Sequence, residues 1–122
     1  MLKIKRAYDK AEKKDGKQIL IDRLWPRGVS KSEANVDTWL KELAPSTELR
    51  KWFAHDPQKW EEFRKKYKAE LDSPEKVKLL EDIAGQARRG DVTLIYSARD
   101  TEHSDVKVLV EIIDKIIAGT RI

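Results

Sequence analysis

The chain has 122 residues, of which 39% are hydrophobic and 39% are charged, and it contains no cysteine. This length fits one compact domain, so we expect a single domain over residues 1–122. No stretch approaches the roughly 20 apolar residues of a membrane span, and residues 1–6 lack an apolar signal core. The missing cysteine excludes disulfides, thiolate catalysis and zinc–cysteine sites, and the expected location is the cytoplasm.

The net charge of +4 is unevenly distributed along the chain. Residues 1–31 hold ten Lys/Arg against four Asp/Glu, whereas the remainder holds sixteen against eighteen. One interpretation is a charged surface of a heat-adapted protein. The other is attraction of an anion, a nucleotide or a nucleic acid to the N-terminal region.

Apolar patterning predicts three strands. Alternating residues indicate a strand over Lys3–Tyr8, and the run Ile19-Leu20-Ile21 indicates a second over Gln18–Leu24. The polar loop between the two strands contains the turn signal Asp15-Gly16, so a hairpin is one alternative for this pair. A third buried strand is expected over Val92–Ser97.

Capping signals and helical spacing predict about five helices. Ser30-Lys31-Ser32-Glu33 resembles a capping box and would open a helix to about Leu43. Its apolar face would contain Val36, Trp39, Leu40 and Leu43, and Trp39, Trp52 and Trp60 are expected in the core. The other predicted helices span about 46–53, 56–71, 74–90 and 105–118.

Together these elements indicate an α/β fold in which about five helices flank a small sheet. The sheet would have about three to five strands and be at least partly parallel. If the strands ending near Leu24 and Ser97 are parallel, their carboxyl ends meet at one edge, where open α/β folds bind ligands.

The segment Asp22-Arg23-Leu24-Trp25-Pro26-Arg27-Gly28 directly follows the apolar run Ile19-Leu20-Ile21. Pro26 restricts its own backbone and that of the preceding residue, and Gly28 permits backbone angles that other residues avoid. A stiff loop of this kind would present Arg23, Trp25 and Arg27. Trp25 would then stack on a base or sugar, or alternatively close the loop on the core.

These residues resemble the signature of the DUF488 family, YeaO-like branch. Further matching segments follow in order at 44–53, 55–57, 63, 67, 70–71 and 93–98, together with Asp100 and His103. The resemblance implies a small cytosolic α/β domain without an established activity. The chain departs from the family at Ser104, where members often carry an asparagine; roles for His103 and Asp100 would survive this change.

The first candidate site binds an anion. Arg23, Arg27 and Arg99 offer planar cations that match phosphate or carboxylate, and the N-terminus of the last helix would face the same edge. Tyr96 would point its hydroxyl at this site or lie in the core. Alternatively, Arg23 or Arg27 pairs with Asp22, Asp56 or Asp100 to fasten loops.

The second candidate is acid–base chemistry by histidine. His103 lies three residues after Asp100, and His55 directly precedes Asp56. A histidine held by a carboxylate moves protons near neutral pH. In the alternative interpretation His55 is a capping or packing residue. Of the nearby hydroxyls at Ser97, Thr101 and Ser104, none lies in a nucleophile elbow.

We expect neither a metal nor a cofactor. The histidines and acids lack diagnostic ligand spacing, and the five glycines form no dinucleotide fingerprint and no P-loop. Three functions remain open. The first is binding of a small phosphate- or nucleotide-like anion, and the others are a protein-interaction module and nucleic-acid binding through the basic N-terminal region and Trp25. The oligomeric state is left open.

Overall fold

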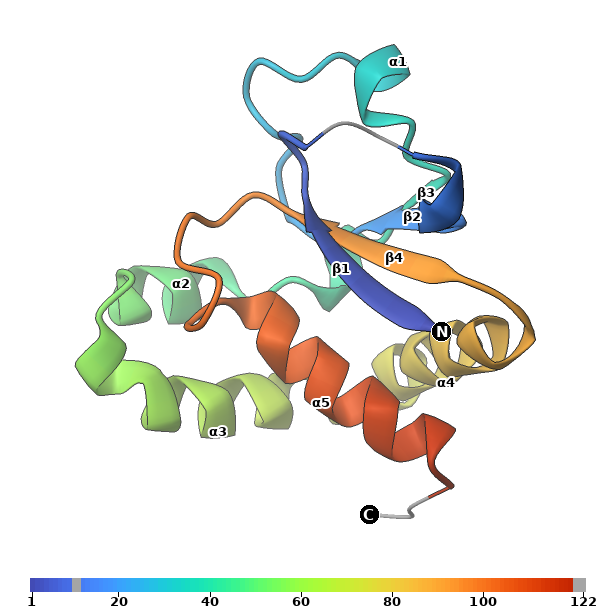
Figure 1. Cartoon of the computed structure of the whole chain (residues 1–122). Helices are drawn as coiled ribbons and strands as arrows, with labels where there is room; N and C mark the ends of the chain where they lie inside the picture. The colour runs from blue at the N-terminus through green and yellow to red at the C-terminus, as the bar shows by residue number, and fades with distance from the viewer. Residues whose placement is uncertain (10–11, 120–122) are drawn as a thin grey trace.

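The computed structural model describes residues 1–9 and 12–119, in which a four-stranded sheet packs against helices (Figure 1). None of the described helices combines the length and apolar character needed to cross a membrane. The predicted small α/β fold is confirmed.

The strands of this fold are β1 (Leu2–Arg6), β2 (Lys17–Leu20), β3 (Thr38–Trp39) and β4 (Val92–Tyr96). Its helices are α1 (Lys31–Ala34), α2 (Thr47–Phe53), α3 (Trp60–Glu70), α4 (Pro74–Arg89) and α5 (Asp105–Ile117), with short 3₁₀ helices η1 (Lys13–Asp15), η2 (Lys41–Leu43) and η3 (Pro57–Lys59).

The sheet has the strand order β1-β4-β2-β3, and every strand pairing in residues 1–9 and 12–119 is parallel. The hairpin considered for the first two strands is therefore wrong, because β4 lies between β1 and β2. Since all four strands point the same way, their carboxyl ends meet at one edge of the sheet. This is the edge at which the sequence places the candidate site.

The helix predicted from residue 30 to Leu43 is also wrong. α1 ends at Ala34, after which Asn35 adopts a left-handed φ of 50°. Thr38–Trp39 then pairs with β2 as an edge strand, and Trp39, expected in the core, is 38% exposed. The apolar residues of this segment have helical spacing, but strand pairing with β2 overrides that local preference.

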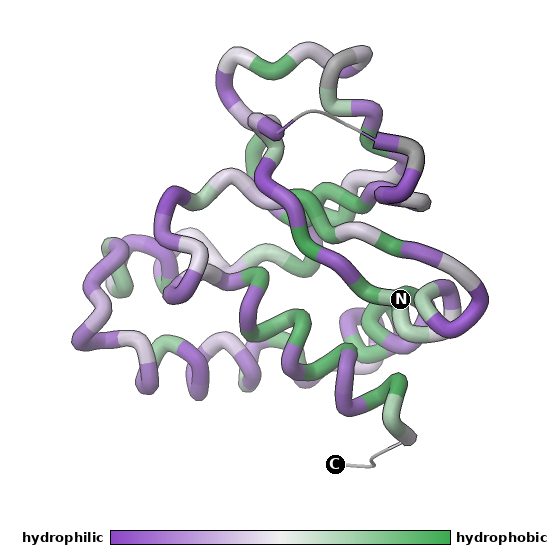
Figure 2. The backbone as a smooth tube through the Cα atoms, in the orientation of Figure 1, coloured by the Kyte–Doolittle hydropathy of each residue, from purple (hydrophilic) through white to green (hydrophobic). Residues whose placement is uncertain are grey.

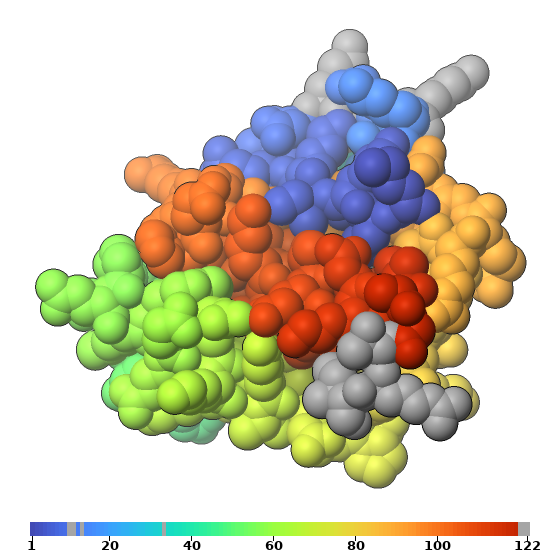
Figure 3. Space-filling view, turned by 60° about the horizontal axis from the view of Figure 1, so that its bottom comes forward, coloured from blue at the N-terminus to red at the C-terminus, as the bar shows by residue number. Residues whose placement is uncertain are grey.

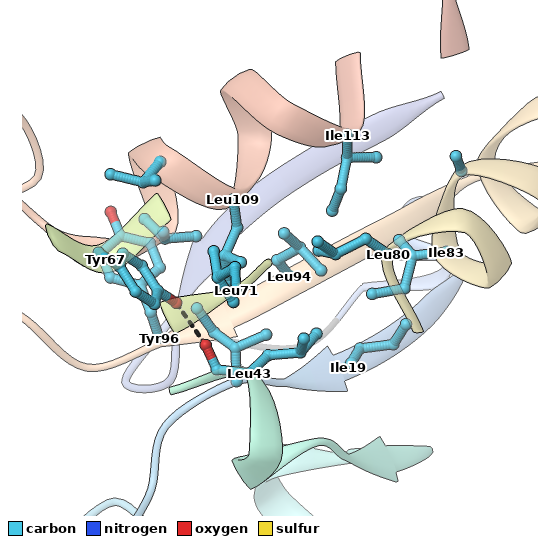
Figure 4. Packing of buried hydrophobic residues seen from close by; sticks show 14 of the residues in the cluster. Ile19, Leu43, Tyr67, Leu71, Leu80, Ile83, Leu94, Tyr96, Leu109 and Ile113 are labelled. Atoms are coloured by element: carbon cyan, nitrogen blue, oxygen red, sulfur yellow. Dashed lines mark hydrogen bonds between the residues drawn. The ribbon is translucent and has the colours of Figure 1, made fainter. Parts of the chain in front are cut away.

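Helices α3, α4 and α5 build the main core against one face of the sheet. Helix α5 packs against α3, α4 and β1, and Figure 3 shows it between α3 and the N-terminal strand. Hydrophobic residues recur along α5 (Figure 2), and Val106, Val108, Leu109 and Ile113 of this helix are buried. Tyr67 of α3 is fully buried, and its hydroxyl donates a hydrogen bond to the carbonyl of Leu43 (Figure 4). Trp52 and Trp60, which were expected in the core, are partly buried against it.

Loops cover the opposite face of the sheet. Ala7, Leu20 and Ile95 form a small buried cluster there, on which Trp25 and Val36 pack. Polar side chains on this face are satisfied by the covering loops: Gln18 donates to the carbonyl of Asn35, and Thr93 to that of Asp15. Trp25 belongs to the segment that follows β2, so its packing on this cluster holds that segment beside the carboxyl edge of the sheet.

Candidate functional site

A cleft of about 900 Å³ opens at the carboxyl edge of the sheet. Chain segments that follow all four strands line it: Tyr8 after β1, residues 22–27 after β2, residues between 44 and 51 after β3, and residues between 97 and 105 after β4. The parallel topology thus converges four loops on one space. This agrees with the general position of ligand sites in open α/β sheets.

The cleft collects nearly all of the residues that the sequence singled out. Tyr96 is the exception, because it is 3% exposed and packs in the core with Leu94 and Leu109 (Figure 4). Burial raises the pKa of the Tyr96 hydroxyl. The predicted residues that do line the cleft are Arg23, Trp25, Arg27, His55, Arg99, Asp100 and His103.

The three predicted arginines differ in how firmly they are held. Arg23 donates from Nη2 to the carbonyl of Pro45 at 3.0 Å, and its buried Nε finds no hydrogen-bond partner among the described residues. Arg27 and Arg99 are exposed at the mouth of the cleft. Within the described chain, none of these arginines forms an ion pair with a carboxylate. The loop-fastening ion pairs considered as an alternative are therefore not formed.

Trp25 serves at least to anchor its loop. Its Nε1 donates to the carbonyl of Val29 at 2.6 Å, and its ring meets Trp39 edge-on at a centroid distance of 5.7 Å. The ring is partly buried against the small cluster on the loop-covered face. Because Trp25 also lines the cleft, its anchored ring forms part of the wall.

His103 and His55 both line this cleft. Asp100 Oδ2 lies 2.9 Å from Nδ1 of His103, while its Oδ1 accepts the backbone N–H of His103 at 3.1 Å. The hydrogen bond from His103 lowers the pKa of Asp100. His55 is exposed, with a left-handed φ of 58° at the end of α2. In the described part of the chain, no group of three or more potential ligands is arranged to hold a metal ion.

Four residues that the sequence did not assign to a site form what we call the inner wall of the cleft: Asp22, Ser97, Ser104 and Asp105. Ser97 Oγ donates to Asp22 Oδ2 at 2.5 Å. Burial, together with the neighbouring charge of Asp22, raises the pKa of Asp105 to about 7. Burial also raises the pKa of Asp22. The Ser104 hydroxyl is buried and hydrogen-bonds to no residue that the structure describes.

Two unpredicted cations, Arg50 and Lys51 of α2, complete what we call the cationic rim: Arg27, Arg50, Lys51 and Arg99, all exposed. With Arg23, the described lining contains five permanent cations against three carboxylates. The spacing within 47–53 indicated a helix but not its position. That α2 reaches this edge depends on β3, which the sequence did not reveal.

The side chain of Asp105 places a carboxyl group at the N-terminus of α5. Asp105 Oδ1 accepts the backbone N–H of Val106 at 3.0 Å, and the N–H of Lys107 donates to the carbonyl of Ser104. The carboxylate of Asp105 therefore already interacts with the positive end of this helix. At least this part of the helix N-terminus, which the sequence suggested for the anion, is thus already capped by the protein.

The basic residues of β1 support the fold. Lys3 lies 3.6 Å from a carboxylate oxygen of Asp91, and Lys5 lies 2.7 Å from that of Asp15. Arg6 donates to the carbonyls of Ser97 and Ala98 and so ties β1 to the loop after β4. These three of the ten cations of residues 1–31 thus have partners within the fold.

Comparison with known proteins gives a consistent family. The family described as "Inactive DUF488-N3 subclade" matches residues 1–121. "Uncharacterized protein YeaO" of Escherichia coli (strain K12) is 45% identical over 111 residues, which cover 90% of this chain and 94% of that protein. "Uncharacterized protein Rv3073c" of Mycobacterium tuberculosis (strain ATCC 25618 / H37Rv) is 33% identical over 113 residues, 93% of each chain.

No solved structure matches the chain. The family match nevertheless spans nearly the whole sequence, and the relatives align over nine-tenths of both chains. The chain therefore belongs to the DUF488 family.

Proposed function

We propose that this protein binds a small anion of phosphate or nucleotide character in the cleft at the carboxyl edge of its sheet. The observation that carries the proposal is the unpaired charge of the cationic rim. Among the described residues, Arg27, Arg50, Lys51 and Arg99 form no ion pair with any carboxylate, although all four line one cleft. Guanidinium groups match the geometry of phosphate oxygens and stay charged at every physiological pH.

The apolar part of the lining suits the remainder of a nucleotide-like ligand. Tyr8 is 51% exposed and Leu24 is 71% exposed, and both line the cleft, as Trp25 does. Large exposed apolar side chains at a concave site are typical of ligand-binding surfaces. A base or a sugar would cover these side chains while its phosphate contacts the rim.

We assign His103 a binding role in this proposal. Asp100 holds Nδ1 of His103, and Nε2 hydrogen-bonds to no described residue, so Nε2 is the atom a ligand would meet. A protonated imidazole donates a hydrogen bond to an anion. The matching family is described as an inactive subclade, which favours binding over acid–base catalysis by His103.

A thermal-shift panel tests the proposal. Its ligands are inorganic phosphate, sugar phosphates and nucleotides, and its proteins are the wild type and the double variant Arg27→Ala/Arg99→Ala. A ligand present at about 100 times its dissociation constant stabilises the folded state by roughly 2.7 kcal/mol. The matched control is Arg89→Ala, because Arg89 is an exposed arginine at the end of α4, away from the cleft.

We expect at least one phosphate ligand to raise the melting temperature of the wild type and the control, and to lose that effect in the double variant. Two results would contradict the proposal. One is the absence of a shift with every anion, which would favour a protein-interaction role for the exposed Leu24. The other is a shift confined to oligonucleotides and erased by salt, which would favour nucleic-acid binding.

A further inference from the structure

The inner wall of the cleft differs chemically from its rim. The rim is exposed and cationic, whereas Asp22, Ser97, Ser104 and Asp105 are buried or half-buried and provide carboxyl and hydroxyl groups. A phosphate pressed against this wall would be repelled by the carboxylates. The wall must therefore face a different part of the ligand from the part that the rim binds.

An unsatisfied hydroxyl marks the inner wall as a contact surface. The Ser104 side chain is 3% exposed, lines the cleft, and has no hydrogen-bond partner within residues 1–9 and 12–119. Buried polar groups in native proteins are almost always hydrogen-bonded, so an orphan at a cleft wall indicates a partner supplied from outside the chain. Such a partner must itself carry a polar group.

The neighbouring carboxyl groups restrict what that partner is. An ionised carboxylate only accepts hydrogen bonds, so Asp22, and Asp105 above its pKa of about 7, require a ligand that donates. Ser97 already occupies one oxygen of Asp22, and Val106 one oxygen of Asp105, which leaves further acceptor positions on each group. An ammonium group is disfavoured, because Arg50 acts electrostatically on both carboxylates and the described lining is rich in cations.

We propose that the ligand is a sugar phosphate or a nucleotide held by its sugar, whose hydroxyl groups donate to Asp22 and Asp105 while its phosphate contacts the cationic rim. Hydroxyl groups are neutral donors, and they also accept, so one of them completes the hydrogen bonding of Ser104. The cleft of about 900 Å³ is large enough for such a molecule. This inference rests on the proposed anion-binding function and specifies the substrate class.

Isothermal titration calorimetry with three probes separates the two proposals. Ribose 5-phosphate carries hydroxyls and phosphate, n-pentyl phosphate carries phosphate on a chain without hydroxyls, and inorganic phosphate carries neither sugar nor chain. The proteins are the wild type, Asp22→Asn, Asp105→Asn and the control Asp114→Asn, which alters an exposed acid on the same helix. Circular dichroism melting verifies that each variant folds.

We expect the wild type and the control to bind ribose 5-phosphate at least about tenfold more tightly than n-pentyl phosphate, the scale of one hydrogen bond to a charged group. In Asp22→Asn and Asp105→Asn this preference should largely disappear, with the affinity for n-pentyl phosphate retained. Equal wild-type affinity for the two organic phosphates would overturn this inference and leave anion binding standing. Failure of all three probes to bind the wild type would overturn both proposals. Because the comparison of the probes uses only the wild type, it tests the inference even if a variant does not fold.

Discussion

The helix-covered face of the sheet and the cleft at its carboxyl edge treat buried polar groups in opposite ways. In the core, the hydroxyl of Tyr67 has its partner in the carbonyl of Leu43, and apolar side chains surround it. In the cleft, Ser104 Oγ and Arg23 Nε are buried without partners among the described residues, and burial raises the pKa of Asp105 to about 7. The first region is built for stability, whereas the second retains unsatisfied groups that a ligand would complete.

The largest effect is expected from the core. Leu94 lies on the central strand β4 and is fully buried, so Leu94→Ala should lower the free energy of unfolding by about 2–5 kcal/mol. Urea denaturation measures this as a lower midpoint with an unchanged slope. A loss below about 1 kcal/mol would show that this core is looser than its packing indicates.

Tyr67→Phe isolates the polar contact in the core from its packing. The ring remains, but the carbonyl of Leu43 loses its donor, so a loss of about 1–3 kcal/mol is expected. Tyr8→Phe is the matched control, because Tyr8 is 51% exposed and its hydroxyl faces no such constraint. Equal denaturation midpoints for both variants would remove the contrast between the core and the surface.

Asp105→Asn should stabilise the protein above neutral pH. The folded pKa of about 7 exceeds the ordinary value of 3.8, so between about pH 4 and pH 7 the unfolded chain releases a proton that the folded chain retains. The wild type therefore loses stability as pH rises through this window. Asparagine keeps the hydrogen bond from Val106 but carries no charge, and we expect a gain of about 1–2 kcal/mol at pH 8.

Denaturation of the wild type and Asp105→Asn at pH 8 and pH 4.5 measures this gain. The difference between the two proteins should shrink at the lower pH, where folded Asp105 is already neutral. A constant difference at both pH values would mean that the charge of Asp105 costs nothing in the fold. The cleft would then lack the electrostatic strain that distinguishes it from the core.

The smallest effect is expected at the outer surface of the helix layer. Glu111 of α5 lies 2.7 Å from Arg64 and 3.1 Å from Lys68, both on α3, and its pKa is lowered first by the hydrogen bond from Arg64. Glu111→Gln should cost about 0.5 kcal/mol at low salt and less at 1 M salt. A salt-independent loss would point to packing rather than charge.

The sequence predicted the elements whose local signals agree with their tertiary surroundings. α2, α4, α5 and β4 all have caps or buried apolar runs, and the structure places them close to the expected positions. The segment after α1 failed because Val36, Trp39 and Leu43 have helical spacing, whereas pairing of Thr38–Trp39 with β2 is a long-range event. No local pattern reports such pairing.

The site was predictable where residues directly follow a strand. Arg23, Arg27, Arg99 and His103 reached the cleft because the carboxyl ends of parallel strands share an edge. Tyr96 does not reach the cleft, because its side chain lies on the helix-facing side of β4 with Leu94, whereas that of Ile95 lies on the other side. The alternation of side chains along a strand could have predicted this orientation. Arg50 was missed because its position depends on the unpredicted β3.

An NMR titration of the ¹⁵N-labelled protein with ribose 5-phosphate tests the central claim most directly. We expect the backbone amide shifts to change in residues 22–28, 50–55 and 97–106, the segments that line the cleft, with little change in α4. Changes confined to β1 and its basic neighbours, or no change at concentrations that saturate typical phosphate sites, would contradict the assignment of this cleft as the binding site.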